Sequence, residues 1–529
     1  MRHFRLVLAL TFAIAAVPSA HAAPFHPCAK GKFRCTTVKV PVDYDDPAGP
    51  QAKIAVSVLP ARDQQHKLGP LFINYGGPGA DAVASTESFG AKLFRSYRDR
   101  FDLVAVDPRG TGASRPALNC HTDQERVGLY RRPFITPDTA DEDVALMHST
   151  FYADRCMAQN GGFAAHVSTA NVARDMDRIR RVLGARRITY FGFSYGTLLG
   201  ATYAALFPAH IRAVVLDGDV DPQTYLVQPT DSSALQTAAF EGALDRYLDA
   251  CRGHRGYCRW MHGRAPADAY DRLIARLDAH PIAARRKKLV GNDHRRVDGQ
   301  DVNVALVSDL YAKQLWPEIT NALNDADRGD GSLVRAISNY FYGRRKSGTY
   351  SAETDRYFMI GAAEQQYPTD PAGYFDLGAQ SFTANPHFFF NSGYVELDYS
   401  VYSARDEDAF AGPFTLPASA PTPLLVGTTF DPATPYSQSA SLAAELGKGR
   451  LLTMRGDGHT AYGGNSHCID HAVDRYVIHL ELPRAGLRCR QTVPFPPVPA
   501  ERATVASATP TGPVGFPTVA LRGRVAPAR

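Results

Sequence analysis

The sequence predicts an α/β protein with a mostly parallel, eight-stranded sheet and an inserted, mainly helical block. Eight apolar, strand-like segments alternate with helix-like segments, an order typical of a parallel sheet that helices cover on both faces. This alternation stops near residue 222 and resumes near residue 423. The chain has 529 residues, which is enough for a large core and for more than one domain.

The expected strands are short runs rich in apolar, β-branched and aromatic residues. In chain order they cover 36–44, 53–60, 70–77, 101–110, 188–194, 211–219, 423–432 and 449–459. The clearest helix covers 169–184, because its apolar residues recur at helical spacing and Gly184 can end it. Segments such as 233–251 and 315–329 make the inserted block look mainly helical. Its simplest interpretation is a cap over the active edge of the sheet.

These patterns divide the chain into five parts. We expect a signal peptide at 1–22, a core in two parts at 23–221 and 421–490, a helical cap at 222–420 and a proline-rich tail at 491–529. The tail contains many prolines and is expected to be extended or partly disordered.

The N-terminus has the order typical of a secretory leader. A short basic region precedes the apolar stretch Leu6–Val17, and Ala20-His21-Ala22 follows as a small-x-small cleavage signature. We therefore expect cleavage after Ala22 and a secreted or periplasmic protein. The apolar stretch is too short to span a bilayer, and no later segment is long and apolar enough for a membrane helix.

Eight cysteines agree with export, although sequence alone does not choose among their possible pairings. Short separations favour Cys28–Cys35, Cys251–Cys258 and Cys468–Cys489, which leaves Cys120–Cys156. No cysteine or histidine cluster has zinc-site spacing, so disulfides are the expected state.

The charge of the chain argues against a nucleic-acid partner. The formal net charge is +5, and loss of the two leader arginines leaves about +3 (5 − 2). The basic run 285–296 has no interleaved aromatic residues, so we interpret it as a solvated loop.

Ser194 lies at a junction between a strand-like and a helix-like segment. It stands in Gly-Phe-Ser-Tyr-Gly, after the apolar run 188–193 and before a run with helical spacing that ends at Pro208. Glycines two residues away on each side permit a tight, strained turn and keep bulk away from the hydroxyl. Gly-x-Ser-x-Gly alone arises often by chance, but this context predicts a nucleophile elbow rather than an ordinary loop serine.

A nucleophilic serine needs a base to take its proton and a carboxylate to fix the tautomer of that base. Asp431 and His459 each follow an apolar strand of the resumed α/β segment, where a loop at the carboxyl end of a strand would place them. Asp217, after the preceding strand, is a rival to Asp431 as the acid. Asp457 is too close in sequence to His459 to orient it easily.

The reaction also needs backbone donors for an oxyanion. One is expected to be the N–H of Tyr195, and the other should come from the loop Gly76–Gly79. Pro78 has no N–H, so Gly76 or Gly77 is the donor, and we choose Gly77. Without the other parts, this loop would be interpreted as a plain tight turn.

Six segments in this order resemble the tripeptidyl aminopeptidase branch of the proline-iminopeptidase-like serine peptidases, which have the α/β-hydrolase fold. They are NYGGPG (74–79), VAVDPRGTGASRP (104–116), the long segment 169–208, VLDGDVDP (215–222), TTFDPATP (428–435) and GDGHTAY (456–462). The resemblance extends from about residue 35 to residue 490.

The resemblance implies an exopeptidase that binds the free amino terminus of a peptide and releases a short N-terminal piece through an acyl-enzyme. Acidic cap residues typically hold the amino group. Relatives often carry Ile-x-Cys-x-Asp there, and this chain has Ile-Gly-Ala-Ala-Glu, which makes Glu364 the candidate anchor. A structural surface glutamate is the alternative. The loop also departs from the usual Gly-Gly-Pro-Gly-Gly-Ser-Gly at 80–82, where Ala-Asp-Ala could alter the pocket wall.

The sequence therefore predicts a monomeric serine aminopeptidase that acts on peptides, with no metal and no cofactor. Ser194 attacks the scissile carbonyl, His459 transfers the proton, and Asp431 orients His459. An esterase or other acyl hydrolase with the same triad, or a non-catalytic binding scaffold on this fold, are the alternatives. The sequence leaves open whether one, two or three residues are released.

Overall fold

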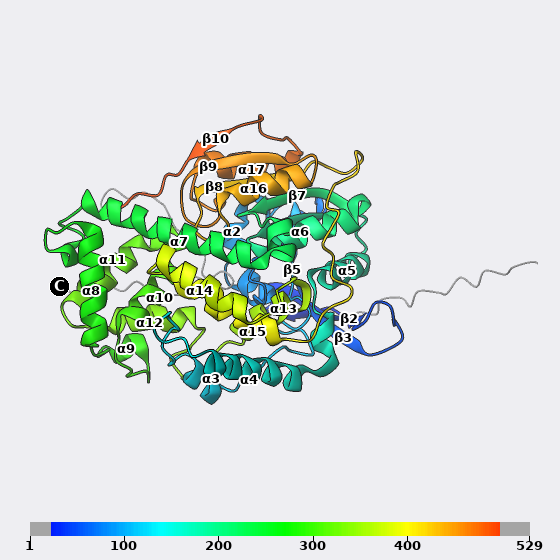
Figure 1. Ribbon diagram of the computed structural model, residues 1–529. Coiled ribbons are helices and arrows are strands. Elements are labelled where there is room, and N and C mark those ends of the chain that lie inside the picture. The colour runs from blue at the N-terminus through cyan, green and yellow to red at the C-terminus, as the bar shows by residue number, and fades with distance from the viewer. Residues whose placement is uncertain (1–22, 498–529) are drawn as a thin grey trace, which may run out of the picture.

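One ten-stranded sheet runs through the protein (Figure 1). The computed structural model describes residues 23–497, so the expected signal peptide and nearly all of the expected tail lie outside the described residues. The strands are β1 (His26–Cys28), β2 (Phe33–Pro41), β3 (Gln51–Leu59), β4 (Gly69–Asn74), β5 (Phe101–Val106), β6 (Ile188–Phe193), β7 (Ile211–Asp217), β8 (Leu424–Phe430), β9 (Arg450–Asp457) and β10 (Arg488–Arg490).

The strand order is β1-β2-β3-β5-β4-β6-β7-β8-β9-β10. Neighbouring strands are antiparallel as far as the β3–β5 pair and parallel from β5 to β10, which confirms a mostly parallel sheet. All eight expected strands are present. The two extra strands, β1 and β10, lie at the two edges and have three residues each, which is too short for a periodic pattern to be visible in the sequence.

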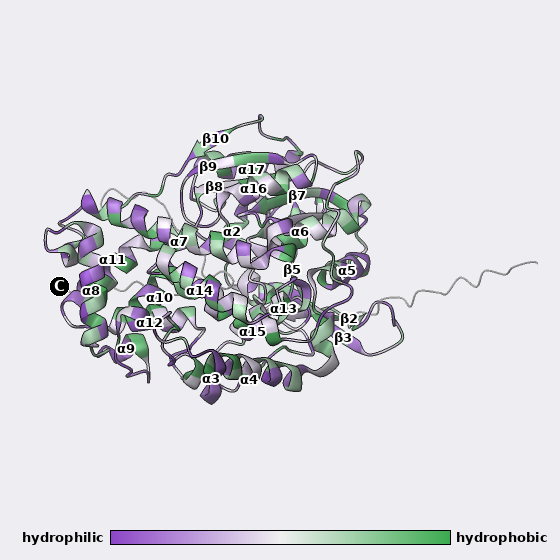
Figure 2. Ribbon diagram, viewed as in Figure 1, coloured by the Kyte–Doolittle hydropathy of each residue, from purple (hydrophilic) through white to green (hydrophobic). Residues whose placement is uncertain are grey.

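Alternate residues of the inner strands face opposite sides of the sheet and build two cores. On β4, Phe72 belongs to one buried cluster and Leu71 and Ile73 belong to the other. The first cluster packs against α5 (Thr169–Val182) and α6 (Tyr195–Leu206), and the second packs against α17 (His467–His479). Figure 2 shows the matching hydropathy, with hydrophobic colour on inner strands such as β7 and mixed colour along outer helices such as α8. This pattern is expected of a sheet covered on both faces.

The remaining helices fall before, within and after the block inserted between β7 and β8. Before it lie α1 (Ala82–Ser85), α2 (Ala91–Leu93), α3 (Asp123–Leu129) and α4 (Glu142–Asn160), and after it lies α16 (Tyr436–Glu445). The block itself holds α7 (Pro229–Arg252), α8 (Pro266–Ala279), α9 (Lys287–Val290), α10 (Gly299–Leu310), α11 (Trp316–Asp327), α12 (Ser332–Phe341), α13 (Glu353–Glu364), α14 (Ala372–Ala384) and α15 (Leu397–Val401).

The inserted block, called the cap below, has a core of its own over only part of its length. Helices α7, α8 and α10 to α12 share a buried cluster centred on Tyr247, Tyr270 and Trp316, and they gather on one side of the molecule in Figure 1. Helix α13 instead packs on the core of the sheet through Phe358, Met359 and neighbouring residues. Helix α13 is therefore one part of the cap that lies against the core of the sheet, as do residues of α14 and α15.

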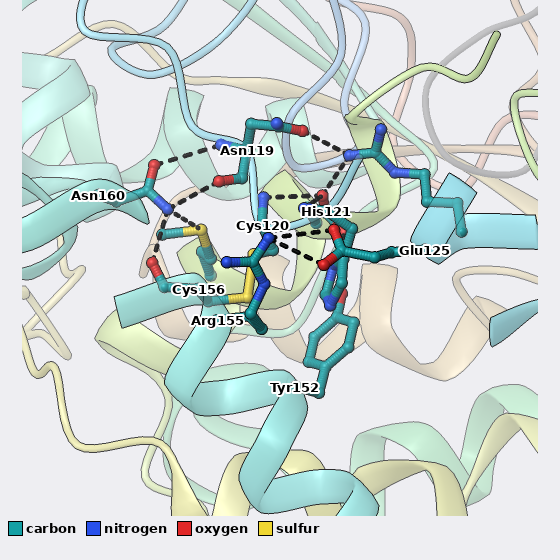
Figure 3. Close-up of a disulfide and its surroundings, with 11 residues drawn as sticks. Asn119, Cys120, His121, Glu125, Tyr152, Arg155, Cys156 and Asn160 are labelled. Carbon is teal, nitrogen blue, oxygen red and sulfur yellow. Dashed lines mark hydrogen bonds and ion pairs between the residues drawn. A yellow bond between two sulfur atoms is a disulfide. The ribbon is translucent and has the colours of Figure 1, made fainter. Parts of the chain in front are cut away.

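All four disulfides expected from the cysteine separations are present: Cys28–Cys35, Cys120–Cys156, Cys251–Cys258 and Cys468–Cys489. Figure 3 shows how Cys120–Cys156 ties the loop after β5 to α4, where the amide of Asn160 also donates to the carbonyl of Asn119. The backbone N–H of Cys120 donates to Asp355 of α13 at 2.9 Å, so this disulfide also lies at a junction with the cap.

Within residues 23–497, no helix is both long and apolar enough to cross a membrane.

Candidate active site

Ser194 forms a sharp turn between β6 and α6. Its φ of 55° and ψ of −132° lie in a region that non-glycine residues rarely adopt. The flanking glycines are required by close approach, since a Cβ on Gly192 would lie 2.2 Å from the carbonyl oxygen of Gly196. A Cβ on Gly196 would lie 2.7 Å from Oδ1 of Asn74. The turn therefore stores strain and leaves Ser194 partly exposed at the N-terminus of a helix, the geometry of a nucleophile elbow.

His459 and Asp431 form a buried pair. The imidazole Nδ1 lies 3.0 Å from each carboxylate oxygen of Asp431, and both side chains are at most 2% exposed. Asp431 also accepts hydrogen bonds from the backbone N–H groups of Ala433 and Thr434, both at 2.9 Å. These contacts hold the carboxylate in place, so the hydrogen is assigned to Nδ1 and Nε2 is the free basic nitrogen. Nε2 is buried and has no hydrogen-bond partner within the described residues.

The end of β7 connects this pair to Ser194. The N–H of Ser194 donates to the carbonyl of Asp217 at 2.9 Å. The next residue, Gly218, packs on the imidazole so closely that a Cβ would lie 2.8 Å from Cε1 of His459. Ser194 and His459 therefore both contact the end of β7, Ser194 from the end of the neighbouring strand β6 and His459 from the end of β9, which is separated from β7 by β8.

Asp217, the alternative acid, contacts the backbone after His459 instead of the imidazole. Its carboxylate accepts from the N–H groups of Ala461 at 2.9 Å and Tyr462 at 2.8 Å. Burial raises the pKa of this carboxyl to about 7. The geometry thus pairs His459 with Asp431 and uses Asp217 to hold the segment that follows His459.

The glycine loop after β4 lies against Ser194. The N–H of Gly76 donates to Oδ1 of Asn74 at 2.9 Å, so it is already engaged. A Cβ on Gly76 would lie 2.9 Å from Cβ of Ser194 and 3.3 Å from the N of Tyr195. Gly77 and Tyr195 are therefore the candidate oxyanion donors, and the N-terminus of α6 adds a favourable partial positive charge.

The close contact at Gly76 leads to a first prediction. Gly76→Ala places a methyl group 2.8 Å from the carbonyl of Phe193 at a φ of +97°, so the loop must shift away from Ser194. We expect kcat to fall about 100-fold, the usual cost of a displacement of about 1 Å at a reacting centre. Hydrolysis of a simple ester measures this effect.

Gly69→Ala is the matched control, because Gly69 has a φ of +119° but no atom lies within 4 Å of the point that its Cβ would occupy. It should cost stability through backbone strain while leaving kcat near the wild-type value. Equal kcat values for the two variants would contradict this role of the glycine loop.

Helix α13 braces the other end of the glycine loop. The guanidinium of Arg356 donates to Oδ1 of Asp81 at 2.7 Å and to the carbonyl of Gly79 at 3.4 Å. The sequence Ala-Asp-Ala at 80–82 differs here from the more usual glycine-rich form. As a result, it supplies Asp81 as an ion-pair partner for the cap.

Glu364, at the end of α13, lies buried beside the residue that follows Ser194. Its carboxylate accepts from the N–H of Thr169 at 2.7 Å and from the hydroxyl of Thr169 at 2.9 Å. The same hydroxyl contacts the hydroxyl of Tyr195. Burial raises the pKa of the Glu364 carboxyl to about 7. Glu364 is therefore a buried acid, rather than a surface glutamate, and the hydroxyl of Thr169 bridges it to the hydroxyl of Tyr195.

Glu396 is a second buried cap acid, and the sequence pattern does not reveal it. It accepts from the N–H of Gly393 at 2.8 Å and from the hydroxyl of Tyr367 at 3.3 Å, and burial raises its pKa to about 7. The ring of Tyr367 stacks on that of Tyr399 at 3.9 Å between centroids. No motif surrounds Glu396 in the sequence, so only its burial among tyrosines identifies it.

The sequence pattern also does not identify Asn74, which accepts a hydrogen bond from the N–H of Gly76, although Asn74 is the last residue of the strand before the glycine loop.

Groups of side chains close enough to share a metal ion do occur among the described residues. They contain either disulfide-bonded cysteines or the set Asp43, His166 and Asp408, and none includes Ser194, Asp431 or His459.

Comparison with known proteins agrees with this fold. Residues 69–256 match the family model described as alpha/beta hydrolase fold, and residues 407–489 match the model described as TAP-like protein. The chain is similar to serine protease Hip1 of Mycobacterium tuberculosis, with 32% identity over 466 residues that cover 87% of this chain and 88% of that protein.

Two other relatives have different names. Carboxylesterase B of Mycobacterium tuberculosis is 35% identical over 462 residues, which cover 86% of each chain. Tripeptidyl aminopeptidase of Streptomyces coelicolor is 27% identical over 455 residues, which cover 84% of this chain and 81% of that one.

The fold, the elbow and these matches define a serine hydrolase of the α/β-hydrolase class. Within that class the chain belongs to the TAP-like serine peptidase family, which confirms the family expected from the six sequence segments.

Proposed function

We propose that this hydrolase is a secreted or periplasmic aminopeptidase that binds peptides by their free amino terminus and releases a short N-terminal piece. The observation that carries the proposal is the buried Glu364, linked through Thr169 to the hydroxyl of Tyr195, the residue that follows Ser194. A carboxylate in a sheltered position can bind an ammonium group strongly, because water competes little there. The disulfides support export, since such bonds persist in oxidising compartments.

In the proposed reaction, the Ser194 hydroxyl attacks the scissile carbonyl while Nε2 of His459 takes its proton. Asp431 keeps the imidazole in the required tautomer and stabilises its charged form. The N–H groups of Gly77 and Tyr195 bind the oxyanion. His459 then protonates the leaving amine. In the second half of the reaction, His459 takes a proton from the water that attacks the acyl-enzyme, and it then returns this proton to Ser194.

The direct test uses one peptide in two forms, with a free and with an N-acetylated amino terminus. The purified mature chain and its Ser194→Ala variant are incubated with each form, and the products are identified by mass spectrometry. We expect cleavage of the free form only, and none by the variant. The fragment mass then gives the number of residues released.

Hydrolysis of esters is the second candidate function, because one relative carries the name Carboxylesterase B. Equal cleavage of the free and acetylated peptides would remove the amino-terminal anchor from the proposal. Failure to cleave either peptide, with a simple ester hydrolysed, would favour the esterase.

The raised pKa of Glu364 predicts how KM depends on pH. Because burial raises this pKa from 4.5 to about 7, the carboxyl is mostly protonated at pH 6 and becomes an anionic anchor as the pH rises through 7. The amino group of a peptide loses its proton above a pKa of about 7.7 to 8.0. The KM for a free peptide should therefore fall from about pH 6 to about 7.5 and rise again at higher pH.

Glu364→Gln should raise KM for free peptides and remove the acid limb of this profile while the alkaline limb remains. An ester substrate without an amino group is the control, and its KM should be the same for both proteins. An unchanged acid limb in the variant would assign that limb to another group and contradict the role of Glu364.

A further inference from the structure

A segment of the cap forms backbone hydrogen bonds with the loop that carries His459. Ala312 and Gly458 form an isolated antiparallel bridge, and the N–H of His459 donates to the carbonyl of Tyr311 at 2.6 Å. Gly458 has a φ of +100°, and a Cβ there would lie 2.9 Å from the same carbonyl. The cap and the histidine loop thus approach as closely as two strands of a sheet, at a position where only glycine fits.

Two cations of the cap bind one carboxylate at the start of this loop. Asp457, 5% exposed and two residues before His459, accepts from Nζ of Lys313 at 2.8 Å and from Nε of Arg246. Lys313 directly follows the bridged residue, whereas Arg246 comes from α7, which passes beside β8 in Figure 1. Arg246 also lies over the ring of Phe430, 3.5 Å from its centroid. A carboxylate this deeply buried is strongly destabilised if its cations are removed.

The backbone of Asp457 is fixed from the opposite side by the segment that follows β10. Its N–H donates to Oε1 of Gln491 at 3.0 Å, and Nε2 of Gln491 donates to its carbonyl at 2.7 Å. The ring of Tyr311 meets that of His459 edge to face, 5.5 Å between centroids. With Gln491 holding one side, the cap residues on the other side set where the loop, and therefore the imidazole, lies.

We propose that Lys313 and Asp457 are positioning residues for His459, so that docking of the cap on the sheet and placement of the catalytic base are one event. This inference rests on the proposed role of His459 as the base. This positioning role differs from a substrate-binding role of the cap. It predicts a lower kcat even for esters, which have no amino group to bind to the amino-terminal anchor.

The test compares Lys313→Met with Lys313→Arg. Methionine keeps the apolar stem but removes the charge, and arginine retains the charge. We expect Lys313→Met to lower kcat for a simple ester about tenfold with little change in KM, and to slow fluorophosphonate labelling of Ser194 by a similar factor. Lys313→Arg should restore most of the rate. Arg246→Met, which removes the more exposed cation, is the second variant and should show a smaller loss of the same kind.

Arg295→Met is the matched control. It breaks an ion pair of similar burial, Arg295–Asp293 at 2.6 Å, that lies wholly within the cap. It should lower the melting temperature without changing kcat or the labelling rate. A folded Lys313→Met protein that is labelled at the wild-type rate would overturn this inference alone. A wild-type protein that is not labelled at all would overturn both the inference and the proposed function.

Discussion

Ser194→Ala is expected to lower kcat by about 10⁵- to 10⁶-fold on peptides and esters alike. The substitution removes the nucleophile, and neither the oxyanion donors nor the His459–Asp431 pair can replace it. Alanine has nearly the same volume and leaves the φ of 55° and the glycine contacts of the elbow as they are. The loss should therefore come without loss of the fold, and kcat measurements together with thermal unfolding test both statements.

Ser437→Ala serves as the control, since Ser437 is an exposed residue on α16 with no part in the proposed reaction. It should retain full kcat and full reaction with a fluorophosphonate, which Ser194→Ala should lose completely. Substantial activity in purified Ser194→Ala would show that another residue is the nucleophile. Absence of labelling in the wild type would favour the non-catalytic scaffold.

The sheet could be predicted from the sequence because its inner strands are buried on both faces. Runs such as β6 and β7 are then mostly apolar, which makes them visible without any alignment. The edge strands β1 and β10 have exposed residues and only three positions each. Their place is fixed by the disulfides Cys28–Cys35 and Cys468–Cys489 as much as by their own residues.

The order of the candidate triad was predictable for a related reason. In a parallel sheet, every loop after a strand lies at the same edge, so Ser194, Asp431 and His459 could be located by the strands that precede them. The same rule could not choose between Asp217 and Asp431, because β7 and β8 are neighbours and both aspartates lie where their strands end. Only the contacts with the imidazole and with the backbone of Ala461 separate the two.

The contacts of the cap could not be predicted in this way. Arg246 and Asp457 are 211 residues apart, and Glu364 and Thr169 are 195 apart. In a parallel sheet, the strand pattern indicates which loops lie at the same edge. Helices connected by long loops have no comparable rule, so no local sequence pattern indicates which residues of the cap contact which residues of the core. Glu364 was found through a family resemblance, and Glu396 was not found at all.

Asp431→Asn is expected to lower kcat about 10⁴-fold with little change in KM. The reason lies in the hydrogen bonds of the carboxylate. The N–H groups of Ala433 and Thr434 both donate to Oδ1, so an asparagine must place its oxygen there. Its amide N–H₂ then takes the place of Oδ2, 3.0 Å from Nδ1 of His459, and favours the tautomer in which Nδ1 is the acceptor. The hydrogen moves to Nε2, and the imidazole can no longer take the proton of Ser194.

Asp217→Asn is the control that tests whether the loss of kcat is specific to Asp431. Asparagine can still accept a hydrogen bond from the backbone after His459, and the His459–Asp431 pair is untouched, so we expect a loss of kcat below about tenfold.

Because burial raises the pKa of Asp217 to about 7, ionising it opposes folding. The wild type should therefore lose stability relative to Asp217→Asn as the pH rises from about 4 through 7. If Asp217→Asn instead caused the larger loss of kcat, the roles of the two aspartates would be exchanged, and the imidazole would have to turn towards β7 during the reaction.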